Sequence, residues 1–415
     1  MNKLIQFISA IVALLLVAAA HGAERNIVLF VTDDQSPDMG CYGNDVIKTP
    51  NMDSLAADGA RFTRAFCTTA SCSASRSVIL SGLHNHANGH YGHVHDFHKF
   101  SSYDWVQTLP VMLQRAGYRT ARVGKHHNGP EEVYFFETKV RGNSRSPYEM
   151  SANCADFINA DDERPFFLYY ATSDPHRGGG DAEDLPHQPN RFGNKPEKQA
   201  YPHIDEVFYD PKDVIVPPFL PDTPTSRAEL AQYYQSISRV DQGLGKLIQV
   251  LKDAGKWENT LFIYTADHGM AFPGAKTTVY EGGMHVPFLV RNPELEKRGT
   301  VNHSMVCFVD ITPTLLDWAG AYDSENGCAK SDIAKLTHFR QRKLPTPQPY
   351  KFHGRSFLPI IGSETADGWN EVYASHTFHE IQMYYPMRVV RGSRYKLIWN
   401  IAHPLPFPFA SDLWA

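Results

Sequence analysis

The chain has 415 residues, of which 42% are hydrophobic and 20% are charged, and its formal net charge at pH 7 is -5. This composition predicts an ordinary globular protein with a sizeable core, organised as one large domain and a smaller one. The negative net charge argues against non-specific binding to nucleic acid, so we expect no nucleic acid among its partners.

The first 23 residues have the features of a signal peptide. Lys3 supplies positive charge, residues 11–17 are apolar, and small residues at 18–23 offer cleavage sites. The apolar stretch is short for a bilayer-spanning helix, and no later stretch is longer and equally apolar. We therefore expect an exported protein without a membrane anchor after cleavage, which is periplasmic, secreted or lysosomal according to the host.

Strands and helices alternate along the rest of the chain. A buried strand is predicted at 26–31, followed by helices at 50–57, from Cys72 and at 109–116, and by strands at 118–123 and 166–170. After a long loop at 177–225, we predict a helix at 227–254, strands at 261–265 and 287–290, and a helix at 311–319. This alternation predicts an α/β fold with a mostly parallel central sheet flanked by helices.

A change of pattern marks the C-terminal part. Residues 320–370 are irregular and polar, and the runs 387–390 and 395–399 flank Gly392-Ser393 as a β-hairpin. We assign residues 1–23 to the signal peptide, 24–345 to the main α/β domain, and 346–415 to the start of a smaller antiparallel subdomain.

Ionisable residues follow four of the predicted strands. They are Asp33 and Asp34, Lys125 and His127, His176, and Asp267 and His268. Ligands bind beyond the carboxyl ends of parallel strands, so we expect these residues to form one site. Three clustered carboxylates need a neutralising cation, and hard oxygen ligands favour calcium or magnesium. The alternative for Asp33 and Asp34 is that they cap the following segment.

The stretch Ser71-Cys72-Ser73-Ala74-Ser75-Arg76-Ser77 is the second candidate feature. Cys72 falls at a predicted helix start, where backbone N–H groups favour an anion, and Arg76 lies one turn further on the same face. Together with Lys125, His127, His176 and Lys276, Arg76 would suit a tetrahedral oxyanion. The alternative is a buried structural cysteine with a surface arginine.

Histidines and the other cysteines are less informative. A run of histidines occupies positions 84, 86, 90, 93, 95 and 98, and no spacing within it matches a standard zinc motif. We interpret this run as a pocket rim or a solvated loop, with zinc binding as the alternative.

The chain has 6 cysteines, so if Cys72 is chemically special the remaining five cannot all pair within one chain.

The stretch Cys72-Ser73-Ala74-Ser75-Arg76 resembles the Cys-x-Pro/Ala-Ser-Arg signature of the type I sulfatases. Further matching motifs follow in that family's order: Asp33-Asp34, Gly124-Lys125, Asp174-Pro175-His176 and Asp267-His268-Gly269. Within the family, the chain is most similar to the heparan N-sulfatases, with shared stretches such as 81–83, 164–169, 209–211 and 385–388. The resemblance runs from about Arg25 to the last residue.

This resemblance implies an alkaline-phosphatase-like fold and a sulfatase whose cysteine a maturation enzyme oxidises to formylglycine. Calcium would be held by Asp33, Asp34, Asp267, His268 and the formylglycine derived from Cys72. Arg76 and Lys125 would stabilise the formylglycine hydrate, and His127 would handle its protons. His176 and Lys276 would contact the sulfate, and His176 would protonate the leaving group.

The implied substrate is a sulfated saccharide, specifically the N-sulfate of glucosamine in heparan-type glycans. An O-sulfatase, a phosphatase or phosphonate hydrolase of the same superfamily, and an inactive carbohydrate-binding homologue are the alternatives. His268 and Lys276 replace the Asn and Arg of many relatives, and Ala74 replaces the commoner Pro. The resemblance further implies that the C-terminal subdomain is truncated. A homodimer is a candidate assembly.

Overall fold

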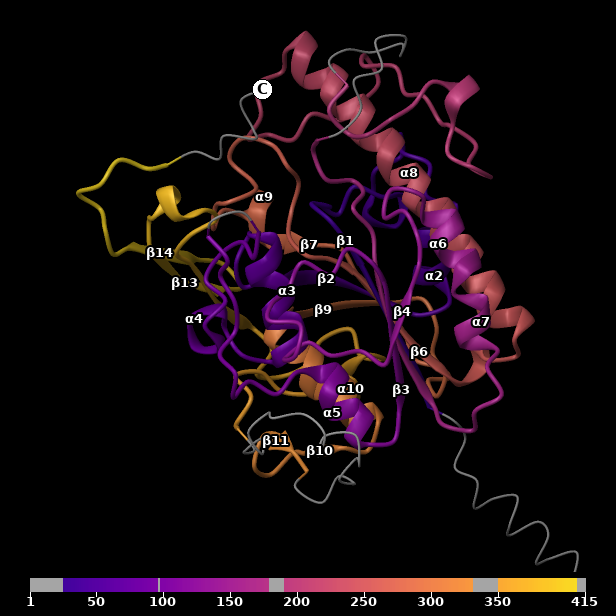
Figure 1. Ribbon diagram of the computed structural model, residues 1–415. Coiled ribbons are helices and arrows are strands. Elements are labelled where there is room, and N and C mark those ends of the chain that lie inside the picture. The colour runs from indigo at the N-terminus through magenta and orange to yellow at the C-terminus, as the bar shows by residue number, and fades with distance from the viewer. Residues whose placement is uncertain (1–24, 96–97, 179–189, 331–349, 409–415) are drawn as a thin grey trace, which may run out of the picture.

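The computed structural model describes residues 25–95, 98–178, 190–330 and 350–408, so the predicted signal peptide lies outside the described residues. Its centre is a nine-stranded sheet in the order β4-β3-β5-β1-β6-β8-β2-β7, with β9 also paired to β2 (Figure 1). The strands are β1 (Asn26–Thr32), β2 (Ala60–Phe66), β3 (Arg119–Gly124), β4 (Thr138–Val140), β5 (Phe166–Ala171), β6 (Thr260–Ala266), β7 (His285–Val286), β8 (Phe288–Arg291) and β9 (Thr300–Cys307).

The first five strands in this spatial order, from β4 to β6, are all parallel. On the other side of β6, strand β8 runs antiparallel to both β6 and β2, whereas β9 is parallel to β2. The predicted mostly parallel sheet is therefore confirmed. Strands β2 and β9 lack the continuous apolar run of β1, and the sequence pattern did not predict them.

Helices cover both faces of the sheet, as Figure 1 shows. One face carries α2 (Pro50–Ala57), α6 (Pro147–Asn153), α7 (Ala155–Ile158) and α8 (Pro224–Asp253). The other carries α3 (Cys72–Ser81), α5 (Leu109–Arg115) and α10 (Ile311–Trp318). The short helices are α4 (Asn85–Asn88), α9 (Glu281–Met284), η1 (Gly40–Tyr42), η2 (Glu197–Gln199), η3 (Trp257–Asn259), η4 (Phe308–Asp310), η6 (Leu358–Ile360) and η7 (Ile381–Met383).

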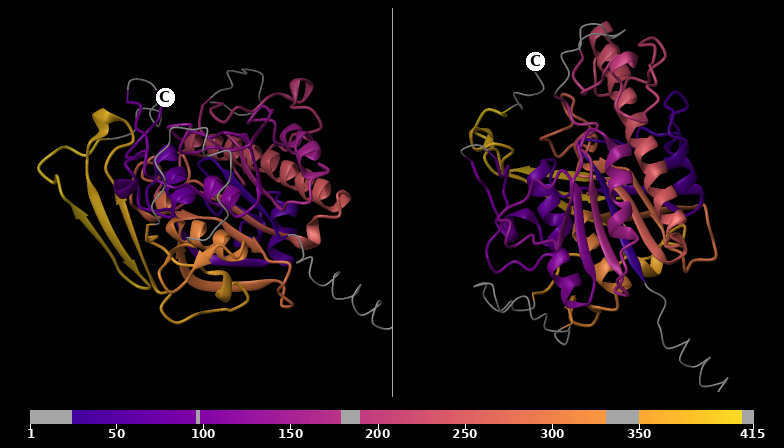
Figure 2. Two further views of the ribbon diagram at one scale, coloured as in Figure 1. Left: turned by 60° about the horizontal axis from the view of Figure 1, so that its bottom comes forward. Right: turned by 45° about the vertical axis from the view of Figure 1, so that its right-hand side comes forward.

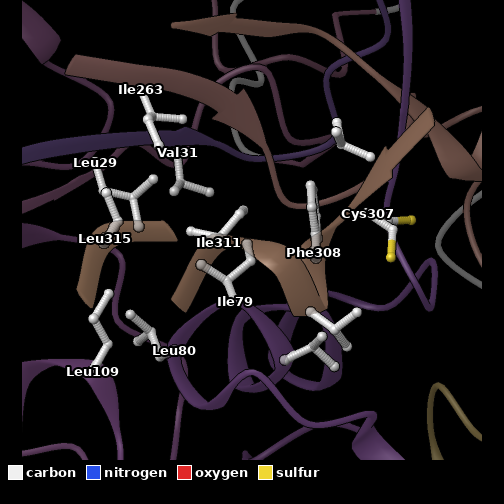
Figure 3. Packing of buried hydrophobic residues seen from close by; sticks show 14 of the residues in the cluster. Leu29, Val31, Ile79, Leu80, Leu109, Ile263, Cys307, Phe308, Ile311 and Leu315 are labelled. Carbon is white, nitrogen blue, oxygen red and sulfur yellow. The ribbon is translucent and has the colours of Figure 1, made fainter. Parts of the chain in front are cut away.

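Strand β1 explains how the two layers are held together. All seven of its residues are buried, and successive side chains point to opposite faces. Val28 and Phe30 pack towards the α8 side. Figure 3 shows Leu29 and Val31 packing on the other side, towards Ile79 of α3 and the first turns of α10.

The predicted helix at 227–254 begins three residues earlier, because Pro224 takes the first helical position and the Thr223 hydroxyl accepts a hydrogen bond from Ser226 N.

The C-terminal part forms a separate three-stranded antiparallel sheet of β12 (Glu371–His376), β13 (Met387–Gly392) and β14 (Lys396–Asn400). The predicted hairpin is thus confirmed and gains a third strand. The left view of Figure 2 shows this sheet at one flank of the molecule, where Val372, Ala374 and Val389 join the core on the α3 side. A small pair, β10 (Tyr322–Asp323) and β11 (Cys328–Ala329), precedes it. Among the described helices, none combines the length and the hydrophobicity needed to cross a bilayer.

Candidate active site

The carboxyl ends of four neighbouring parallel strands form the site. In the order β3, β5, β1 and β6 these strands deliver Lys125, His176, the pair Asp33-Asp34, and the pair Asp267-His268. The expectation that the polar strand ends converge is therefore confirmed. The convergence follows from the parallel arrangement, because strands running in one direction end at one edge of the sheet.

Cys72 is the first residue of α3 and is fully buried. Its Sγ lies 3.2 Å from His268 Nε2 and 3.9 Å from Asp34 Oδ1. Burial raises the pKa of the thiol well above its usual range, and the charges of Asp33 and Asp267 add to this effect against Lys125 and Lys276. The unmodified cysteine is therefore held as a thiol, which is a poor nucleophile.

Three buried carboxylates surround the end of β1. One oxygen each of Asp33, Asp34 and Asp267 lies within 4.8 Å of the others. Burial acts to raise the pKa of Asp33, but Lys125 and other cations outweigh it and hold that pKa well below the usual range. Burial and the charge of Asp33 raise the pKa of Asp267 to about 6. The alternative that Asp33 and Asp34 act only as caps does not account for this cluster.

His268 points into the same cluster. Its Nε2 lies 3.1 Å from Asp34 Oδ1, and its Nδ1 lies 3.0 Å from the carbonyl oxygen of Gly269. Because a carbonyl only accepts hydrogen bonds, Nδ1 carries a proton and Nε2 faces the carboxylates. Three carboxylates and one imidazole nitrogen at this spacing fit a divalent cation.

Arg76 and Lys125 balance the carboxylate charge. The Arg76 guanidinium is fully buried and donates to Asp267 Oδ2 at 2.9 Å, Asp33 Oδ1 at 3.4 Å and the Tyr169 hydroxyl at 3.2 Å. Lys125 Nζ forms an ion pair with Asp33 Oδ2. The alternative of a surface arginine is therefore wrong, because α3 packs Arg76 directly against the ends of β1 and β6.

His176 and Lys276 lie near the second carboxylate oxygen of Asp34, Oδ2. Lys276 Nζ is 3.1 Å from Asp34 Oδ2 and 3.2 Å from His176 Nε2. Because an ammonium only donates, Nε2 accepts this hydrogen bond. Burial and the neighbouring Lys276 charge lower the pKa of His176 to about 3, so the imidazole is neutral near pH 7. Together these residues place one cation and one neutral imidazole next to the carboxylate cluster.

A buried ion pair that the sequence did not reveal holds the turn carrying His176. Asp174 Oδ2 lies 2.8 Å from Arg239 Nε of α8, and Asp174 Oδ1 lies 2.7 Å from Arg145 Nη1. Both Asp174 and Arg239 are fully buried. The motif indicated Asp174, but no local signal pointed to Arg239, which lies 65 residues further along the chain.

His127 lies near Lys125 but makes its side-chain contacts with other histidines. Its Nε2 is 2.8 Å from His95 Nδ1, and its ring stacks on that of His93 at a centroid distance of 5.0 Å. Its backbone φ of 56° is in the left-handed region, which a non-glycine residue rarely adopts. The interpretation of the histidine run as a solvated loop is wrong for His90 and His93, which are buried. His90 packs against Tyr134, and His93 packs against His379 of the C-terminal part.

Comparison with known proteins identifies the family. The family model described as Sulfatase matches residues 25–321. The chain belongs to the sulfatase family. N-sulphoglucosamine sulphohydrolase from Homo sapiens is 38% identical over 410 residues, which cover 97% of this chain and 78% of the human protein. An ulvan-active sulfatase from Formosa agariphila is 28% identical over 395 residues, which cover 92% of this chain and 67% of that protein.

Solved structures confirm the expected sulfatase fold. A protein in complex with its substrate D-glucosamine-2-N,6-O-disulfate superposes with a TM-score of 0.66 at 22% identity, covering 91% of this chain and 89% of that chain. The phosphonate monoester hydrolase of Agrobacterium radiobacter superposes with a TM-score of 0.64 at 19% identity, covering 91% and 87%. The family assignment and the polar site at the strand ends place this sulfatase among hydrolases.

Proposed function

We propose that this sulfatase hydrolyses the N-sulfate of glucosamine in heparan-type glycans, releasing sulfate and a free amine. The observation that carries the proposal is the position of Cys72. It is the first residue of the buried helix α3, and its Sγ lies beside His268 and Asp34. The 38% identity with the human N-sulphoglucosamine sulphohydrolase, over nearly the whole chain, supports the choice of substrate.

The first cofactor that we propose for this enzyme is a divalent cation, and the resemblance to the sulfatases implies that it is calcium. Asp33, Asp34, Asp267 and His268 would hold it, together with residue 72. The cation would supply positive charge that lowers the pKa of the attacking hydroxyl and balances the sulfate oxygens. This donor set fits a cation because its three carboxylates are fully buried and each places an oxygen within 4.8 Å of the others, as hard oxygen ligands of one ion would lie.

The second cofactor is formylglycine, made from Cys72 by a maturation enzyme. Its hydrated aldehyde would supply one hydroxyl that attacks sulfur and a second hydroxyl that allows sulfate to leave. The buried, protonated thiol of Cys72 supports this modification, because a thiol in that state is ill suited to attack sulfur directly.

The remaining site residues have roles that follow from their charges. Arg76 and Lys125 orient the groups on residue 72 and stabilise negative charge there, with His127 as the nearby group for proton transfer. Lys276 binds the sulfate oxygens, and His176 protonates the departing amine. The negative charge of a sulfate group next to His176 would raise the pKa of its imidazole towards the range needed for this donation.

Sulfate release from two monosaccharides tests the proposal. The protein, produced in a host that forms formylglycine, is incubated with glucosamine N-sulfate and with glucosamine 6-O-sulfate, and sulfate is measured by ion chromatography. We expect release from the N-sulfate only. Release from the 6-O-sulfate alone would replace the proposal by an O-sulfatase.

Two further measurements distinguish a phosphoryl-transfer enzyme and an inactive homologue from a working sulfatase. Faster turnover of a phosphate ester than of the sulfate ester with the same leaving group would favour a phosphatase or phosphonate hydrolase. Mass spectrometry of the tryptic peptide from Ala65 to Arg76 reports the state of Cys72. An unmodified cysteine in protein from the native host would favour an inactive carbohydrate-binding homologue.

The proposal includes an exported location and the domain division at residue 345. The signal peptide at 1–23 and the segment 331–349 lie outside the described residues, so both assignments rest on the sequence pattern. A homodimer is the assembly to test, and size-exclusion chromatography with light scattering would determine it.

A further inference from the structure

Three histidines from two separate segments meet beside the active site. His93 and His95 precede Lys99 in one loop, and His127 follows β3. One ring nitrogen of each lies within 4.8 Å of a nitrogen of both others. The rings of His93 and His95 stack at a centroid distance of 4.5 Å, and those of His95 and His127 stack at 5.0 Å. This cluster is separate from the carboxylate cluster around Asp34.

The spacing of the nitrogens is close to that of a metal site. Zn²⁺ binds imidazole nitrogen at about 2.0–2.1 Å, so two ligands of a tetrahedral ion lie about 3.4 Å apart. His95 Nδ1 and His127 Nε2 lie 2.8 Å apart, and the remaining distances are below 4.8 Å. Small rotations of the side chains would therefore bring all three nitrogens to ligand positions.

Two of the three rings are shielded from solvent, since His93 is 4% exposed and His127 is half-buried. The Nδ1 atom of His127 is buried and has no hydrogen-bond partner.

The edge of the cluster connects it to the helix that carries Cys72. His379 Nε2 lies 2.8 Å from His93 Nε2, and His379 Nδ1 lies 3.1 Å from the hydroxyl of Ser71. His379 thus adds a fourth imidazole next to the cluster. It fixes the position of His93 through the hydrogen bond between the two rings.

We propose that His93, His95 and His127 form a second metal site, which takes Zn²⁺. The donors are imidazole nitrogens, which suit Zn²⁺ far better than they suit Ca²⁺ or Mg²⁺. Three histidines leave one position of a tetrahedral ion open. The site shares His127 with the proton-transfer machinery proposed above, so bound Zn²⁺ withdraws this residue and inhibits sulfate release. This inhibitory consequence rests on the proposed function, whereas the binding itself does not.

Co²⁺ binding tests the site without any need for turnover. Co²⁺ is added to the holoenzyme in saturating Ca²⁺, and the strong visible absorption typical of four-coordinate Co²⁺ is recorded and then displaced with Zn²⁺. We expect one Co²⁺ per chain. His95→Gln, at an exposed position, should weaken binding at least about tenfold. His98→Gln, on the same segment but outside the cluster, should bind as the wild type does.

The outcomes either support the site or overturn it. No Co²⁺ band in the wild type, or equal affinities of His95→Gln and His98→Gln, overturns the proposal. If His95→Gln does not fold, carbethoxylation of His95 in the wild type with and without Zn²⁺ replaces it, and absence of protection overturns the site. In an active preparation, Zn²⁺ should inhibit sulfate release, and His95→Gln should raise the inhibitory concentration at least about tenfold. If the protein releases no sulfate even when Zn²⁺ is absent, the proposed function is contradicted. The Co²⁺ titration still tests the metal site in that case, because it measures binding and not turnover.

Discussion

Removing the Arg239 guanidinium tests whether α8 positions the turn that carries His176. Arg239 is fully buried and donates from Nε to Asp174 Oδ2 at 2.8 Å and from Nη1 to Asn194 Oδ1 at 2.9 Å. Loss of one partner of a buried ion pair costs about 3–5 kcal/mol in the free energy of unfolding. Asp174 keeps Arg145 at 2.7 Å, so we expect Arg239→Met to cost about 3 kcal/mol, at the lower end of that range.

Activity should fall as well, because His176 follows Asp174 by two residues. A displacement of about 1 Å at a reacting group can cost about 100-fold in rate, so we expect kcat/KM to fall about 10- to 100-fold. Urea unfolding measures the stability, and sulfate release at a temperature where the variant stays folded measures the activity. In the double variant with Asp174→Asn, the loss in the free energy of unfolding should be smaller than the sum of the single losses by about 1–3 kcal/mol.

Arg291→Met is the matched control. Arg291 is also a buried arginine, paired with Asp58 at 2.7 Å, but it contacts Trp257 of η3, which precedes the start of β6 and lies opposite the end that carries the site. This variant should lose stability while its kcat/KM stays unchanged. A cost below 1 kcal/mol for Arg239→Met, or an equal loss of kcat/KM in Arg291→Met, would refute the positioning role.

Three further predictions concern the nucleophile, the cation and the response to pH. Cys72→Ala should lower kcat/KM for sulfate release by about 10³-fold or more without changing the unfolding midpoint, because it removes the proposed nucleophile. His268→Asn should raise Ca²⁺ affinity about tenfold in calorimetry, because an amide oxygen suits Ca²⁺ better than an imidazole nitrogen. Burial lowers the pKa of His90 from 6.5 to about 4, so the unfolded chain binds more protons between these pH values. The stability that His90 contributes is therefore present above pH 6.5 and is lost as pH falls to about 4, by up to about 3 kcal/mol, and His90→Gln should reduce this loss in urea unfolding.

Each of these predictions has a clear contrary result. Retained turnover in Cys72→Ala would remove residue 72 from the reaction. Unchanged Ca²⁺ affinity in His268→Asn would mean that the imidazole does not reach the cation. Equal losses of stability on acidification in His90→Gln and the wild type would assign that loss to other groups.

Local sequence pattern was enough for the elements that the sequence predicted well. The apolar run at 26–31 marks β1, and Pro50 with Gly59 brackets α2, whose bounds match the prediction. These features depend on hydrophobic periodicity and on the conformational limits of single residues, which neighbours along the chain largely decide. The same holds for Cys72, since a helix start and the spacing to Arg76 are local properties.

Tertiary structure alone decided which residues are buried and which distant segments meet. The burial of Arg76 depends on β1 and β6 lying over α3, and the pairing of Arg239 with Asp174 depends on how α8 packs against the sheet. Likewise, the ring of His127 contacts those of His93 and His95 only because the loop after β3 packs against the segment that carries His93 and His95. Long-range contacts depend on the summed packing of many segments, so no short stretch of sequence specifies them. The sequence by itself determined the chemical groups of this sulfatase and their order along the chain, and the fold determined which of them act together.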